Sequence, residues 1–329
     1  MRRFFSALLL VTLLAACMGA PPSPAPSTPL TVGLGFIPNV QFAQFYRADR
    51  QGYYREAGLD VTFQHGIDPE LITLVGQGAV DIGMGDGTSL IPAVSQGIPV
   101  RYVASVYARF PSVVIAPLES GISEPADLAG RTLGIPGRFG SSWIMLQALL
   151  ASAGLTPDDI EITLYPDFGQ AVALREGQVE AATGFANNEP VQLGLAGLQT
   201  NVLRVDEITP LPGPGLVVGE RTLQEKPEAL RLFVAATLRA MEEIMAQPEA
   251  GLEDAVAAVP ELGEDRATQL TILQATIEMW QSPYTEQQGL GAIDVEAWSE
   301  SIEFMRSLPE SSVTPDLRAE QLVTEELLP

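Results

Sequence analysis

The stretch LTVGLG at residues 30–35 begins an alternation of strands and helices, and this alternation decides the fold. Its apolar character predicts a buried strand. After it the sequence predicts a helix over residues 40–57, a strand over 59–65, a helix over 69–78, a strand over 80–84, a helix over 88–96, and strands over 101–107 and 112–116. Such alternation is typical of an α/β domain, in which helices cover both faces of a mostly parallel sheet.

A second series of the same kind follows. The sequence predicts strands over residues 131–135, 160–165 and 179–183, separated by helices over 142–153 and 169–176. The segment GAVDIG at 78–83 is echoed by GQVEAA at 177–182, and in both a tight turn leads through an acidic residue into a strand. We therefore expect two similar α/β lobes.

The end of the chain is helical, with helices expected over residues 227–246, 263–281 and 293–307. If these helices pack on the first lobe, residues 30–117 begin lobe 1, residues 118–211 form lobe 2, and residues 212–329 return to lobe 1. The chain then crosses between the lobes near Leu118 and again near residues 211–215. Because two crossings can act as a hinge, a ligand cleft is expected between the lobes.

The first 29 residues carry the signals of an exported lipoprotein. Arg2 and Arg3 precede an apolar run over residues 4–14, which has the length of a secretory signal and is too short to span a bilayer. LAAC at 14–17 matches the lipobox of bacterial lipoproteins, in which Cys17 is acylated; an ordinary signal peptide with a chance cysteine is the alternative. We predict a signal peptide over 1–16, a lipidated proline-rich tether over 17–29, and anchorage to the outer face of the cell membrane.

Composition excludes several classes of function. Without residues 1–16 the chain has 16 basic and 41 acidic side chains, a net charge of −25, which disfavours nucleic acid as a partner. We interpret the acidic stretch over residues 225–254 as a solvated helix face. Cys17 is the only cysteine and His65 the only histidine, which excludes a disulfide, a thiolate or histidine-cluster metal site and a cysteine nucleophile. The chain also has no G-x-S-x-G motif, and we expect no catalytic residue and no metal.

Ligands of open α/β sheets bind beyond the carboxyl ends of the strands. This rule selects the loops over residues 36–42, 85–89, 137–142 and 185–190, together with residues 107–111 beside the first crossing. The loops combine aromatic rings, amides, hydroxyls and two carboxylates, although each ring could instead pack in the core and each carboxylate could cap a helix. The candidate ligand-binding residues are Asn39, Gln41, Phe42, Asp86, Thr88, Ser89, Tyr107, Arg109, Phe110, Phe139, Gly140, Ser141, Ser142, Asn187, Asn188 and Glu189.

Several segments resemble one family of solute-binding proteins. LGFIPN at 34–39, QGYYREAGLDV at 51–61, QGIPV at 96–100 and DLAGRTLG at 127–134 are similar to the family related to the fungal thiamine-pyrimidine synthases. The resemblance implies a type II periplasmic-binding-protein fold and a monomer that delivers a ligand to the permease of an ABC importer. The fungal enzymes carry a reacting histidine where this chain has Ser89, and their cysteine-rich iron-binding run is absent, so an enzyme is not expected.

Other segments look like the riboflavin-binding proteins of bacterial riboflavin importers: IPNVQFA at 37–43, RFP at 109–111, GRFGS at 137–141 and ANNEP at 186–190. This resemblance implies riboflavin as a transported ligand and no resident cofactor. A thiamine pyrimidine precursor is the alternative ligand. A sulfonate or nitrate is disfavoured because the candidate loops hold few cations, with Arg109 and Arg138 as the exceptions.

Overall fold

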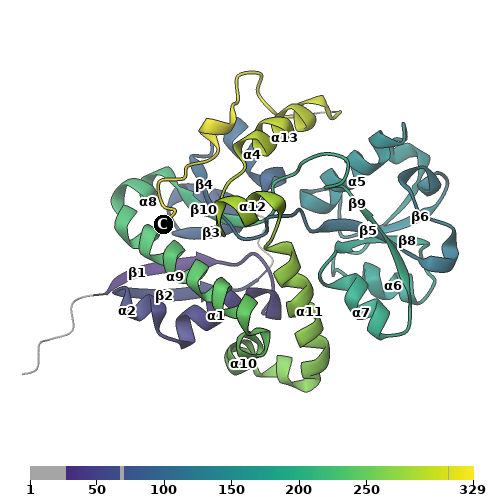
Figure 1. The fold of residues 1–329 in the computed structure, drawn as a ribbon. Helices are drawn as coiled ribbons and strands as arrows, with labels where there is room; N and C mark the ends of the chain where they lie inside the picture. Colours follow the sequence, from purple (N-terminus) through teal and green to yellow (C-terminus); the bar gives the residue numbers. More distant parts are fainter. Residues whose placement is uncertain (1–26, 67–69, 310) are drawn as a thin grey trace, which may run out of the picture.

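The computed structural model describes residues 27–66, 70–309 and 311–329, and Figure 1 shows them as two lobes joined by crossing segments. The predicted signal peptide, Cys17 and the tether as far as residue 26 lie outside the described residues. In the part of the chain that the structure describes, no helix combines the length and the apolar character that crossing a membrane requires.

The first lobe is built on a five-stranded sheet in the order β2 (Leu59–Gln64), β1 (Thr28–Gly33), β3 (Ile82–Gly85), β10 (Gly215–Gly219) and β4 (Val100–Ser105). β1 runs parallel to β2 and β3, whereas β10 is antiparallel to both of its neighbours. The sheet is therefore mixed, but β2, β1, β3 and β4 share one direction and only β10 runs against them, so most of its strands are parallel as predicted. No strand was predicted over β10, which enters the first sheet from the other lobe.

The second lobe repeats this arrangement with the order β7 (Glu161–Leu164), β6 (Thr132–Ile135), β8 (Ala181–Phe185), β5 (Ser112–Pro117) and β9 (Thr200–Arg204). Here β6 is parallel to β7 and β8, and β5 is antiparallel to β8 and β9. Val32 pairs with Ile82 in one sheet and Leu133 pairs with Ala181 in the other, so the sequence echo reflects equivalent strands. In each sheet, the strand that is antiparallel to both neighbours directly follows a segment that crosses between the lobes: β10 in the first sheet and β5 in the second.

The position of β5 corrects one predicted boundary. Residues 112–117 were expected in lobe 1, but β5 belongs to the second sheet, so the first crossing lies between Ser105 and Ser112 and not near Leu118. The second crossing lies between β9 and β10, where residues 211–214 of the predicted crossing lie and Gly215 begins β10. The crossings touch, since the Tyr107 N–H donates to the Pro214 carbonyl at 2.8 Å. Strand propensity alone does not say which sheet a strand joins, and this is why the boundary was misplaced.

The helices cover both faces of the sheets, as predicted. Leu216 and Val218 of β10 belong to one core cluster and Val217 to another, so alternate residues face different layers. The first part of lobe 1 contains α1 (Ala43–Arg50), α2 (Tyr53–Glu56), α3 (Leu71–Gln77) and α4 (Gly87–Ser95), and lobe 2 contains α5 (Gly140–Ser152), α6 (Gln170–Arg175) and α7 (Glu189–Leu195). Then follow α8 (Glu220–Glu225), α9 (Pro227–Ala246), α10 (Pro248–Ala258), α11 (Arg266–Met279), α12 (Pro283–Gln288) and α13 (Val295–Ser307). Short 3-10 helices are η1 (Val40–Phe42), η2 (Leu118–Ser120), η3 (Pro125–Leu128), η4 (Pro157–Asp159), η5 (Pro260–Asp265) and η6 (Ala319–Gln321).

Two helix predictions need correction. The single helix expected over residues 40–57 is divided into η1, α1 and α2, because Gly52 between α1 and α2 has a φ of 80°. An α-helix requires negative φ, so it cannot run through this glycine. Helices α10 and α12 were not predicted, and they begin at Pro248 and Pro283. Proline is favoured in the first helical turn, because an N–H there has no acceptor within the helix and its absence costs no hydrogen bond.

Strand β1 begins inside the predicted tether. Thr28 and Pro29 were assigned to the tether, but both belong to β1, and the Thr28 N–H donates to the Gly58 carbonyl at 2.8 Å. Proline has no N–H to give to a sheet and is confined to unpaired edges. Pro29 meets this condition because β3 pairs with β1 only at Val32 and Gly33.

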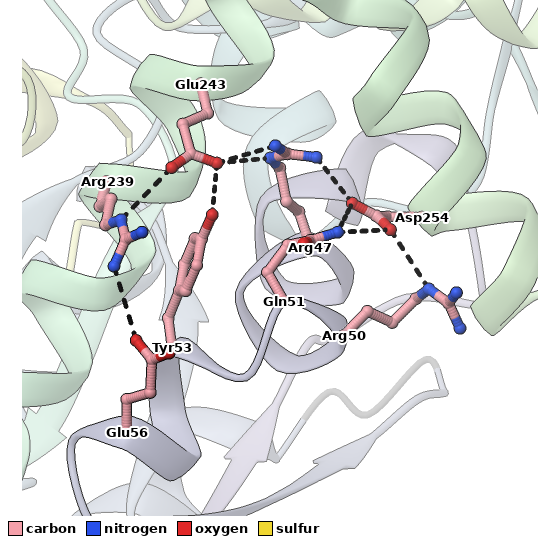
Figure 2. Close-up of polar contacts among 8 residues, drawn as sticks. All are labelled: Arg47, Arg50, Gln51, Tyr53, Glu56, Arg239, Glu243 and Asp254. Carbon is pink, nitrogen blue, oxygen red and sulfur yellow. Dashed lines mark hydrogen bonds and ion pairs between the residues drawn. The ribbon is translucent and has the colours of Figure 1, made fainter.

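A polar network fastens the C-terminal helices to lobe 1 (Figure 2). The Arg47 guanidinium on α1 lies 2.8 Å from Glu243 of α9 and 2.8 Å from Asp254 of α10. Asp254 also accepts hydrogen bonds from Arg50 and Gln51, and its side chain is only 8% exposed. This part of the acidic stretch is therefore not a solvated face, because two of its carboxylates bind α1.

Candidate ligand-binding cleft

A cavity of about 320 Å³ lies between the two lobes. Its walls are the loops that follow the strands, as the strand-end rule predicts. Lobe 1 contributes Leu34, Gly35, Phe36, Gln41, Phe42, Met84, Gly85, Asp86 and Ser89; lobe 2 contributes Pro136, Ser141, Ser142, Phe168, Gln170, Gly184, Phe185, Asn188 and Glu189. Tyr107 and Pro214 complete the lining from the two crossings.

The structure brings nine of the predicted residues together in this lining: Gln41, Phe42, Asp86, Ser89, Tyr107, Ser141, Ser142, Asn188 and Glu189. They come from every loop that the sequence analysis selected. Loops that are more than 100 residues apart in the sequence thus meet at one cavity because each follows a strand of its lobe. This convergence makes the cavity the candidate site.

The other seven predicted residues do not line the cavity. For most of them, a hydrogen bond or their place in the core accounts for this. Asn39 caps η1 by accepting from the Gln41 N–H at 3.0 Å. The Thr88 hydroxyl donates to the Asp86 carboxylate at 2.7 Å, and Gly140 begins α5 with a φ of 64°. Phe110 is 1% exposed in the core of lobe 2, whereas Phe139 is 61% exposed.

Arg109 faces a different hollow. This hollow of about 860 Å³ lies beside the crossings, and its lining includes Arg109, Phe110 and residues of α11 and α12. Arg109 pairs there with Asp206 at 3.3 Å. The hollow is larger than the cleft, but its walls are crossing segments and C-terminal helices and not paired strand-end loops. We therefore place the candidate site in the smaller cavity.

Asn187 does not line the cavity, but its side chain joins the two lobes by hydrogen bonds. Its side-chain Nδ2 donates to Gln41 Oε1 at 2.8 Å and to Thr276 Oγ1 at 2.9 Å, and all three residues are buried. Gln41 in turn donates from Nε2 to Asn39 Oδ1 at 3.2 Å. The orientation of the Gln41 amide is thus held from both ends. Burial raises the pKa of Tyr107, which remains a protonated hydroxyl and donates to Gln41 Oε1 at 3.4 Å.

Asp86 is both a helix cap and a wall of the cavity. Its carboxylate accepts from the Ser89 N–H at 3.0 Å, and the Asp86 N–H donates to the Ser89 hydroxyl at 3.0 Å. These two reciprocal bonds form a capping box at the start of α4. Burial raises the pKa of Asp86, and the hydrogen bonds from Thr88 and Ser89 act in the opposite direction. The two roles that the sequence left open for Asp86 are therefore compatible.

Glu189 lies in the loop after β8 of lobe 2 and is the first residue of α7, one place further into its helix than Asp86, which precedes α4. Its carboxylate accepts from the Phe185 N–H at 2.6 Å and from the Asn188 side chain at 3.1 Å. Burial raises the pKa of Glu189, and the Phe185 N–H lowers it. The Asn188 amide oxygen accepts from Gln192 at 2.8 Å, so neighbouring bonds hold both polar side chains.

Eleven lining residues were not among the predicted site residues, and most of them lie inside or directly beside the predicted loops. Phe168 and Gln170 are different, because they follow β7, to which the strand-end rule was not applied. Phe168 has a positive φ of 61°, which is uncommon outside glycine, and its ring meets the Phe36 ring of lobe 1 edge-to-face at 6.0 Å. These two rings give the cavity an apolar side formed by both lobes.

Three known proteins are similar to most of the chain. The riboflavin-binding protein RibY of Chloroflexus aurantiacus is 33% identical over 98% of this chain and 96% of its own length. The formylaminopyrimidine-binding protein of Halalkalibacterium halodurans is 27% identical, with 92% of each chain covered. The solved structure of the alkanesulfonate-binding protein SsuA of Xanthomonas axonopodis pv. citri, bound to MOPS, has a TM-score of 0.69 at 16% identity and covers 92% of this chain and 99% of that chain.

The structural similarity confirms the predicted two-lobed periplasmic-binding-protein fold, and at 16% identity it shows the fold alone. The family is established by the sequence. The NMT1/THI5-like family model matches residues 39–251, which is most of the chain. Together with the full-length similarity to RibY, this match confirms the family resemblance. The chain belongs to the NMT1/THI5-like family.

Proposed function

We propose that this protein is the extracytoplasmic solute-binding component of an ABC-type importer and that its ligand is riboflavin. The observation that carries the proposal is the interlobe cavity, where aromatic rings from both lobes stand beside amides, hydroxyls and carboxyls. Pockets for small molecules are apolar with a few placed polar groups that fix orientation. The full-length similarity to RibY supports riboflavin as that small molecule.

The lining suits a flat ring with a polar edge. Phe36, Phe42 and Phe168 provide aromatic surface for the isoalloxazine ring, with Tyr107 at the crossing. Phe110 and Phe139, the other aromatic candidates from the sequence, do not line the cavity. The ring edge and the ribityl hydroxyls need partners when they leave water, and the polar lining residues can supply them: Gln41, Asp86, Ser141, Ser142, Asn188 and Glu189.

A binding role accounts for the lining better than an enzymatic one. No histidine lines the cavity among the residues that the structure describes, and Ser89 takes part in a capping box. A receptor should bind its ligand, gain stability by mass action and release the ligand chemically unchanged after denaturation. Turnover of the bound compound by the purified protein would contradict this role.

We further propose that the protein is exported and held by lipid on Cys17, as a monomer that meets a permease. The lipobox motif and the proline-rich segment after it support the anchor. The ABC-importer role supports the permease as a partner.

The ligand is tested by titrating the protein into riboflavin and following flavin fluorescence, which stacking on aromatic rings should quench. Asn188→Ala should weaken binding about tenfold, because one lost hydrogen bond to a bound ligand costs about 1–3 kcal/mol. Asn201→Ala is the matched control, since the Asn201 side chain donates to the Ile122 carbonyl within lobe 2 and does not line the cavity.

A thiamine pyrimidine precursor is the second candidate ligand. The similarity to the formylaminopyrimidine-binding protein over 92% of the chain favours it. If micromolar protein does not quench flavin fluorescence and calorimetry shows tight binding of a pyrimidine precursor, that precursor becomes the proposed ligand in place of riboflavin. The receptor role is unchanged by this outcome.

A further inference from the structure

The charges around the cavity have one sign. Of the residues that line it in the described part of the chain, Asp86 and Glu189 carry acids, and none is Lys, Arg or His. The two cations of the predicted loops make other contacts. Arg109 pairs with Asp206, and the Arg138 guanidinium lies over the Trp143 ring at 5.4 Å from its centroid. A ligand in this cavity therefore meets two carboxyls without a counter-cation.

Helix starts do not compensate for these acids. The N-terminus of α4 is capped by Asp86 itself. Helix α5 begins without a side-chain cap, and Ser141 and Ser142 of its first turn line the cavity. A helix start carries the equivalent of about half a positive charge, which is less than the negative charge of two ionised carboxyls.

We infer that Asp86 and Glu189 make this cleft selective for uncharged ligands, so that it excludes phosphate esters and sulfonates of otherwise suitable shape. The inference rests on the proposed function: for flavins it means riboflavin and not flavin mononucleotide, the phosphate ester of riboflavin. A phosphate ester carries about −1.5 to −2 charges at pH 7. Placing like charges together in a desolvated site is strongly unfavourable.

The surroundings of the two acids act on their charge in opposite directions. Burial raises the pKa of both Asp86 and Glu189, which favours the uncharged form, whereas the hydrogen bonds that each carboxylate accepts lower the pKa and favour the charged form. An anionic ligand in the same cavity would raise both pKa values further and would favour uptake of a proton, which costs free energy at neutral pH. The carboxyls cannot turn away easily, because Thr88 and Ser89 hold Asp86 and the Phe185 N–H holds Glu189.

The test compares riboflavin with flavin mononucleotide by fluorescence quenching, since both carry the same ring. The proteins are the wild type, the neutral isosteres Asp86→Asn and Glu189→Gln, and Glu161→Gln as a control on the exposed start of β7. We expect the wild type to prefer riboflavin by about 100-fold, because like-charge contacts in an interface cost several kcal/mol. Each isostere should reduce this preference by about tenfold through tighter binding of the phosphate ester, and the control should not.

A second arm separates the two carboxyls from the overall acidity of the chain. The field of the net charge is screened within about 8 Å at 0.15 M salt, whereas buried charges are screened much less. The preference should therefore persist at 0.5 M salt. A preference that disappears in salt, or that is unchanged in both isosteres, would overturn the assignment to Asp86 and Glu189.

The remaining outcomes are also decisive. If the wild type binds both flavins equally, the inference is wrong and the proposed ligand stands. If it binds neither flavin, the proposed ligand fails and the inference fails with it.

Discussion

The buried amide of Asn187 offers a direct test of how the lobes are joined at the cleft. In Asn187→Ala, Gln41 Oε1 loses its donor at 2.8 Å and keeps only the Tyr107 hydroxyl at 3.4 Å. Thr276 is less affected, because its hydroxyl still donates to the Ile272 carbonyl at 2.8 Å. The substitution therefore leaves one buried acceptor poorly satisfied.

The loss in the free energy of unfolding of Asn187→Ala can be estimated from these lost and retained hydrogen bonds. An unsatisfied buried acceptor costs about 1–3 kcal/mol, so we take about 2 kcal/mol for Gln41. Asn187 Oδ1 is buried and has no partner among the described residues, so its removal recovers part of that amount. The net loss in the free energy of unfolding should be about 1–2 kcal/mol. Riboflavin binding should weaken about tenfold, because Gln41 is no longer held in one orientation at the cavity wall.

The assay is urea unfolding followed by tryptophan fluorescence, combined with the flavin titration. Asn201→Ala serves again as the control: it removes one amide bond inside lobe 2, should lower stability by about 1 kcal/mol, and should leave affinity unchanged. In the double variant Gln41→Ala/Asn187→Ala the unsatisfied acceptor is gone, so the loss should be smaller than the sum of the two single losses. Additive losses, or an Asn187→Ala protein with wild-type stability and affinity, would refute the reasoning.

Three further predictions concern the rest of the molecule. Asp254→Ala should lower the free energy of unfolding by about 2 kcal/mol in urea denaturation, since removing a buried ionic partner is strongly destabilising and Arg47 retains Glu243. Cys17→Ser should move the protein from the membrane fraction to the soluble fraction with ligand binding intact; a variant that stays with the membrane would contradict the lipobox. Burial raises the pKa of Glu189 above its usual 4.5, so wild-type stability should fall as pH rises from 4.5 through the folded-state pKa. The Glu189→Gln variant has no carboxyl at this position and should not show this loss. The difference between its thermal unfolding midpoint and that of the wild type should therefore increase over that pH range and stay constant above it.

Much of the fold could be predicted from local patterns. The helix over residues 227–246 was predicted with the bounds that α9 has, and the strand over 59–65 differs from β2 by one residue. Such segments carry their own signals, since proline opens α9 and a glycine precedes β2. The strand-end rule also located the cleft, because the direction of a strand determines the edge of the sheet at which its loop emerges.

Only the tertiary structure decided which distant segments become neighbours. Strands β5 and β10 each complete the sheet of the lobe they enter, and no local pattern specifies their partners. Asn187 and Asn188 are adjacent amides, yet one is buried against Gln41 and the other lines the cavity. Phe139 and Phe168 are both loop aromatics, and only Phe168 lines the cavity. Residue type and periodicity determine what a segment can form, whereas the packing of the two lobes determines which side chains meet in the space between them.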